Sequence, residues 1–198
     1  MKRFLLAVLL LPAACNQQAD SRQAEETAAS PEDRAATEMH SEIGAKPSMA
    51  LLPDGLSYRV AGGTETVQVS FGAPQESIER VAREAFGEPR ERTSNEECGA
   101  GPMEFAQYGP LQLNFQDGAL VGWFLQSGGK VATVDGVQPG VTTFDDLARD
   151  HEGRMADGST LEGEFSYQPL GGGERVGGFV DRDGTILSLN AGMNCFFR

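Results

Sequence analysis

The chain has 198 residues, a formal net charge of −13 and a pI near 4.5. Nucleic-acid binding depends on a basic surface that neutralises phosphates, so this acidic balance argues against a nucleic-acid partner. It also argues against electrostatic adhesion to anionic lipid. The 25 glycines and 10 prolines indicate a turn-rich fold with much strand.

Residues 1–14 are typical of a secretory signal peptide. A basic pair, Lys2-Arg3, precedes an apolar run, Phe4–Leu11, and two alanines stand directly before Cys15. The run is shorter than the roughly 20 residues that a membrane-spanning helix needs. We therefore predict that the chain is exported and the segment is cleaved.

The four residues Pro12-Ala13-Ala14-Cys15 resemble the lipobox of bacterial lipoproteins, although proline stands where that family usually has leucine. The resemblance implies that Cys15 carries a lipid, and that Asn16 after it directs the protein to the outer membrane, facing the periplasm. Several acyl chains, at about 0.8 kcal/mol per buried CH₂, anchor a protein stably. A plain signal peptide with a chance cysteine is the alternative.

Residues 15–50 are predicted to be a disordered, lipidated tether. From Asn16 to about Ala50 the chain is rich in Ala, Glu, Gln, Ser and Thr and has no aromatic residue. Such a segment buries too little apolar surface to offset the entropy lost on ordering. We expect His40, which lies here, to be solvated rather than a ligand.

The rest of the chain, residues 51–198, is predicted to be an α+β domain in which two halves repeat one plan. The halves comprise residues 51–125 and 126–198, and each combines one short helix with a small antiparallel sheet. A shift of 66 residues brings together identical pairs at helices and turns: Ala82-Arg83 and Ala148-Arg149, Gly87 and Gly153, Asp117-Gly118 and Asp183-Gly184.

In the first half, apolar residues recur at helical spacing from Ile78 to Phe86. Pro74 suits the first turn of this helix, and Gly87 suits its end. The strands predicted in this half are 56–60, 66–71, 103–108, 111–115 and 119–125, with a hairpin turn at Asp117-Gly118. We expect the strands 56–60 and 66–71 to begin the same sheet.

In the second half, Thr143 begins a helical pattern and Asp146 completes a weakened capping box. Gly153 is expected to end this helix. The predicted strands are 161–168, 176–181 and 185–189, with a turn at Asp183-Gly184.

A short helix that is ended by glycine and followed by a meander is similar to the small outer-membrane assembly lipoproteins of the SmpA/BamE type. Its tandem arrangement resembles the β-lactamase inhibitor protein fold. A more specific resemblance, over about residues 51–198, is to a family of secreted bacterial proteins without an established activity. The motifs that carry it are Glu97-Cys98-Gly99-Ala100-Gly101-Pro102-Met103, Asn114-Phe115-Gln116-Asp117-Gly118, Gly122-Trp123 and Cys195-Phe196-Phe197-Arg198.

Apart from Cys15, the chain has two cysteines, Cys98 and Cys195. In an oxidising compartment we predict that they form one disulfide. The closed loop of about 100 residues would contribute roughly 4 to 5 kcal/mol to stability. The alternative is a reactive thiol at Cys98, which the neighbouring Glu96 and Glu97 disfavour because carboxylates weaken thiolate formation.

The sequence does not predict an enzyme. His151, the one histidine of residues 51–198, is expected to be partly exposed near a helix end without a nucleophile. No Cys/His cluster predicts a metal, and the glycine-rich stretches lack the nucleotide pattern that a dehydrogenase requires. We therefore predict no metal and no cofactor. A rival hypothesis is an enzyme with a carboxylate pair, Glu96/Glu97 or Asp145/Asp146.

The residues from Leu120 to Leu125 are apolar on both faces of their strand, so one face is available to a partner. We therefore predict a binding surface at Tyr108, Trp123 and Phe124. The function predicted from the sequence is a noncatalytic envelope lipoprotein that binds a protein or a cell-wall component. A β-lactamase-inhibitor-like inhibitor of a hydrolase is the more specific alternative.

Overall fold

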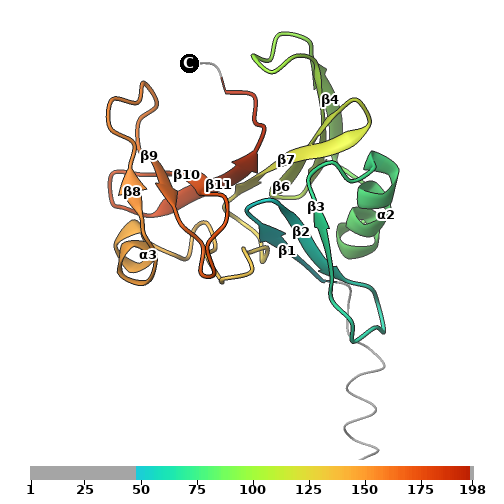
Figure 1. The fold of residues 1–198 in the computed structure, drawn as a ribbon, viewed down its shortest axis with the longest axis horizontal. Helices are drawn as coiled ribbons and strands as arrows, with labels where there is room; N and C mark the ends of the chain where they lie inside the picture. Colours follow the sequence, from blue (N-terminus) through green and yellow to red (C-terminus); the bar gives the residue numbers. More distant parts are fainter. Residues whose placement is uncertain (1–47, 197–198) are drawn as a thin grey trace, which may run out of the picture.

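The computed structural model describes residues 48–196, and this part of the chain is an α+β domain with two helices (Figure 1). The predicted α+β class is therefore confirmed, whereas Cys15, the signal segment and all but the end of the tether lie outside the described residues. Neither helix in residues 48–196 is long and apolar enough to cross a membrane. The elements are β1 (Ser48–Leu52), β2 (Gly55–Arg59), β3 (Val67–Ser70), α2 (Gln75–Phe86), β4 (Glu91–Asn95), β5 (Met103–Tyr108), β6 (Leu111–Gln116), β7 (Ala119–Gln126), α3 (Phe144–Asp150), β8 (Arg154–Met155), β9 (Glu164–Tyr167), β10 (Val176–Val180) and β11 (Ile186–Gly192).

The strands form two antiparallel sheets. The large sheet has eight strands in the order β4-β5-β6-β7-β11-β10-β9-β8, and the small sheet has the order β1-β2-β3. At the centre of the large sheet, β7 pairs with β11, so that Leu125 lies opposite Leu189 and Trp123 opposite Ala191. Figure 1 shows α3 and the small sheet below the large sheet, α2 against its right-hand part, and the C-terminal segment on the other side.

The helix α2 forms where the apolar spacing predicts it. Ile78, Val81 and Ala82 lie on one face and are buried in the core. Pro74 is the N-cap, and the N–H of Gly87, at φ 83°, donates to Arg83 O at 2.8 Å. The positive φ explains why glycine ends the helix.

The helix α3 begins as predicted but ends earlier. The Thr143 hydroxyl accepts a hydrogen bond from Asp146 N at 3.2 Å, which confirms the cap. The helix ends at Asp150, with His151 as C-cap, so the predicted end at Gly153 is wrong. The chain turns extended at His151 before the glycine is reached.

The predicted turn at Asp117-Gly118 is confirmed: both residues have positive φ, 50° and 73°, and connect β6 to β7 as a two-residue hairpin. The turn at Asp183-Gly184 is longer. The Asp181 carboxylate accepts hydrogen bonds from Asp183 N and Thr185 N, both at 2.9 Å, and Gly184 has φ 80°.

Three expectations about the first strands are corrected. The strands predicted at 56–60 and 66–71 do not begin the large sheet, because β2 and β3 pair with β1 in the small one. The strand β1 begins at Ser48, so the last residues of the predicted tether belong to the domain. The edge strand β4 was not predicted, because its five polar residues show no apolar alternation.

Candidate binding surface

The two faces of the large sheet differ in chemistry. One row of cross-strand neighbours crosses all eight strands, and none of its members is fully buried. We call this row the outer row and its side of the sheet the outer face. From β4 to β8 the outer row is Glu91, Gln107, Gln112, Phe124, Asn190, Gly177, Ser166 and Arg154.

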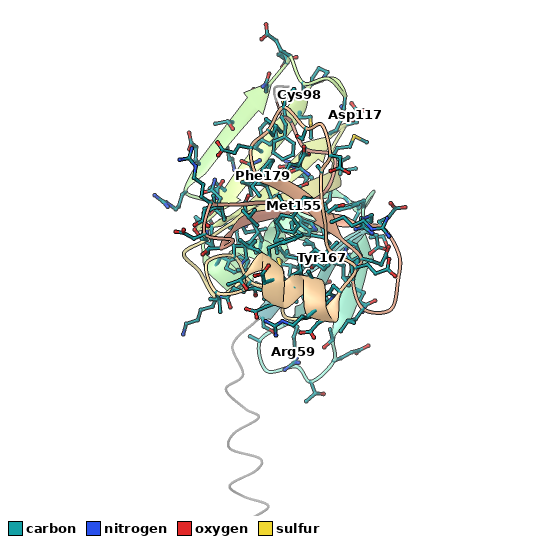
Figure 2. All side chains as sticks on the ribbon, turned by 90° about the vertical axis from the view of Figure 1, so that its left-hand side faces the viewer. Arg59, Cys98, Asp117, Met155, Tyr167 and Phe179 are labelled. Carbon is teal, nitrogen blue, oxygen red and sulfur yellow. A yellow bond between two sulfur atoms is a disulfide. The ribbon has the colours of Figure 1, made fainter. Side chains whose placement is uncertain are left out.

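The adjacent row of the same strands belongs to the core. It is apolar and buried except at its last member, Met155, on the edge strand β8. From β5 to β8 its members are Tyr108, Leu111, Leu125, Leu189, Gly178, Phe165 and Met155. Successive side chains of a strand point to opposite faces, so the outer row points away from this core. Figure 2 shows Tyr167 beside α3 and Phe179 toward the opposite side.

The C-terminal segment Met193–Phe196 covers the centre of the outer face. Asn114, which is fully buried, donates from Nδ2 to Met193 O and to Asn194 Oδ1, each at 2.9 Å. The Phe196 ring packs edge-to-face against two rings of the outer face, Phe124 at 5.9 Å and Phe179 at 5.5 Å between centroids. In Figure 1 the segment rises between the β4–β5 loop and the β8–β9 loop.

The predicted disulfide between Cys98 and Cys195 is present, with an S–S distance of 2.13 Å. Cys98 lies in the β4–β5 loop, near the top of Figure 2, and Cys195 lies in the C-terminal segment. Asn95 Nδ2 also donates to Cys195 Sγ at 3.5 Å. The disulfide therefore fixes the C-terminal segment to the first half of the large sheet.

The predicted binding surface requires a correction. Tyr108 is 1% exposed and Trp123 is 0% exposed, so neither belongs to an exposed surface. Both point toward the core: Trp123 donates from Nε1 to Leu52 O at 2.8 Å, and the Tyr108 ring packs against Phe86 of α2. Phe124 lies on the outer face and is half-buried.

A buried polar cluster lies between α3 and the loop that follows β7. His151 Nδ1 is 3.5 Å from Asp135 Oδ2, with side chains 6% and 4% exposed, so the expected partly exposed histidine is wrong. The Tyr167 ring packs edge-to-face on His151, and its hydroxyl donates to Asp135 Oδ1 at 3.4 Å. Burial raises the Tyr167 pKa well above its usual value. Asp135 is 16 residues from His151 in sequence, so no local motif predicts the pair.

The carboxylate pairs considered for catalysis do not converge on a site. Asp146 accepts a hydrogen bond from Thr143 Oγ1, which lowers the Asp146 pKa, and it also pairs with Arg149. Glu96 and Glu97 are exposed in the β4–β5 loop. In residues 48–196 no group of three His, Cys, Asp or Glu side chains could hold a metal ion.

Exposed acidic residues flank the outer face at both ends. Glu96 and Glu97 lie in the β4–β5 loop, and Asp157 and Glu162 lie in the β8–β9 loop. Figure 1 shows these two loops on either side of the C-terminal segment. The loops therefore form acidic rims around an amide and aromatic centre.

No protein-family model, curated protein or solved structure matches this chain. The function has to be inferred from the chemistry of the outer face itself.

Proposed function

We propose that the chain is a noncatalytic binding module of the bacterial cell envelope, and that the outer face of the large sheet recognises a protein partner. The observation that carries this proposal is the outer row. Its members combine amides, a hydroxyl and an aromatic ring, and none is fully buried, whereas the adjacent row is core. Protein-binding surfaces use such rings for contact area and such amides for hydrogen bonds.

The location of the module rests on the sequence of the N-terminus. We propose that the signal segment is cleaved, that Cys15 is lipidated, and that the domain faces the periplasm from the outer membrane. The Cys98–Cys195 disulfide supports an oxidising compartment, because disulfides persist outside the cytoplasm.

We also propose that the two halves of the large sheet repeat one structural plan. Each helix start is hydrogen-bonded to the hairpin turn of its own half. Gln75 N donates to Gly118 O at 2.9 Å, and Phe144 N donates to Gly184 O at 2.8 Å. The two acceptors are 66 residues apart, which is the shift that aligns the sequence.

Inhibition of an envelope hydrolase is the more specific version of this proposal. An eight-stranded face with protruding loops on both sides offers a broad surface to a folded enzyme. Standard protein complexes bury roughly 800 Å² on each partner, which a face of this kind can supply.

In-cell photocrosslinking tests the binding proposal. A benzophenone amino acid is introduced at Gln107 and at Ser166, one in each half of the outer row, and at Glu84 on the solvent side of α2 as the matched control. We expect one dominant protein adduct from both outer-row positions and none from Glu84. Equal adducts at all three positions, or no adduct at normal abundance, would reject the proposal.

A further inference from the structure

The C-terminal segment is held on the outer face mainly by side chains. The last backbone pairing is that of Met193 N with Val121 O at 2.8 Å, and within residues 48–196 no later residue makes a backbone-to-backbone hydrogen bond. Asn194 Nδ2 donates back to Ala191 O at 3.0 Å, and Cys195 is held by its disulfide. Phe196 is the first residue beyond this last covalent attachment.

Phe196 lies between rings from the two halves of the sheet. Phe124 belongs to β7 and Phe179 to β10, and the Phe196 ring meets both edge-to-face, at interplanar angles of 67° and 80°. Each such ring pair shifts an equilibrium by roughly two- to tenfold. The position between Phe124 and Phe179 is therefore a site for one aromatic side chain, and Phe196 occupies it.

The attachment at Cys195 limits which part of the segment can move. Met193 and Asn194 stay over Asn114, because the disulfide and the Asn114 hydrogen bonds hold them. Phe196 can leave by rotation of the chain after Cys195, without reduction of the disulfide. Its departure uncovers Phe124 and Phe179 and leaves the rest of the outer face unchanged.

Resting on the proposed binding function, we infer that Phe196 is an internal competitor for the partner protein. The partner inserts an aromatic side chain between Phe124 and Phe179, and Phe196 has to leave this position first. The tethered ring competes at an effective concentration in the millimolar range, because it is fixed one residue from the disulfide. The free protein is thus held in a state of reduced affinity.

A peptide with the chain's own C-terminal sequence tests the inference without knowledge of the partner. The probe is the synthetic peptide of residues 192–198 with serine in place of Cys195, titrated into protein that carries ¹³C-labelled phenylalanine. We expect the probe to bind the Phe196→Ala variant at least about tenfold more tightly than the unmodified protein, with shifts of the Phe124 and Phe179 ring signals. A probe with alanine in place of Phe196 should not bind.

Two further variants make each outcome decisive. Phe179→Ala combined with Phe196→Ala should lose probe binding, and Phe196→Leu, which keeps apolar bulk, should bind the probe less well than Phe196→Ala. Equal affinity of the unmodified protein and Phe196→Ala, or no binding to Phe196→Ala with the disulfide intact, would overturn the inference. Crosslinked adducts from Gln107 and Ser166 would then still support the binding function, whereas their absence beside a positive titration would reject that function alone.

Discussion

Arg92 of the edge strand β4 binds both carboxylate oxygens of Glu79 in α2, with Nη1 at 2.5 Å from Oε1 and Nη2 at 2.6 Å from Oε2. Glu79 is 7% exposed, and its Oε1 also accepts a hydrogen bond from Gln75 at 3.0 Å. The hydrogen bonds from Arg92 hold the pKa of Glu79 at about 2. This ion pair fixes the helix to the edge strand of the large sheet.

Removal of the Glu79 charge should destabilise the domain. Glu79→Gln leaves Arg92 without its bidentate partner, and we expect a loss of about 1 to 3 kcal/mol in the free energy of unfolding. The matched control is Glu84→Gln on the same helix, where the exposed pair with Arg80 should contribute under about 0.5 kcal/mol. Urea unfolding followed by Trp123 fluorescence measures both. Equal losses in the two variants would contradict the assignment.

The same carboxylate makes stability depend on acid pH. The folded-state pKa of about 2 lies below the model value of 4.5, so the contribution is full above pH 4.5 and is lost as the pH falls toward 2. The shift corresponds to about 3 kcal/mol, which screening on the half-exposed Arg92 side reduces to about 1 to 2 kcal/mol. Urea midpoints between pH 6 and pH 2 should fall more steeply for the unmodified protein than for Glu79→Gln. Parallel curves would show that Glu79 does not carry this dependence.

Loss of the disulfide should be the most destabilising of these changes. Cys98 and Cys195 are 97 residues apart, and in the entropy model the closed loop contributes about 4 to 5 kcal/mol. The double variant Cys98→Ser with Cys195→Ser should show this loss in urea unfolding. Reduction of the unmodified protein by a dithiol should reproduce it, while the double variant should not respond to the dithiol. A stability unaffected by either treatment would contradict the prediction.

The single tryptophan should behave as a core residue. Trp123 is 0% exposed and donates to Leu52 O, which joins the large sheet to the turn between β1 and β2. Its emission should be blue-shifted and poorly quenched by acrylamide in the folded protein. Trp123→Phe should cost about 1 to 3 kcal/mol, because the Leu52 carbonyl is left without this donor. Hydrogen exchange should rise first in β1, and uniform exchange over the domain would contradict this link.

Local patterns predicted the elements of this fold well. The spacing of Ile78, Val81 and Ala82 has the helical period, and α2 lies there. The Asp117-Gly118 pair requires positive φ, and the hairpin turn is at that position. The edge strand β4 escaped prediction because its polar residues contact water on both faces and so show no alternation.

Strand pairing and side-chain direction could not be predicted in the same way. The alternation around Trp123 and Phe124 shows that their side chains point to opposite faces, but does not tell which face meets the helices. That choice depends on the packing of α2, α3 and the small sheet, which placed Trp123 in the core. Likewise, nothing local to β2 and β3 reveals that β1 is their partner.

The sequence by itself determined the α+β class, the two helices, the hairpin turns and the pairing of Cys98 with Cys195, because each depends on local periodicity, backbone conformation or a count of two. Only the tertiary structure decided the rest. It brought Asp135 to His151 and placed Phe196 between Phe124 and Phe179, which come from strands far apart in the chain. Such contacts depend on the order of strands in a sheet, and no pattern within one segment encodes that order.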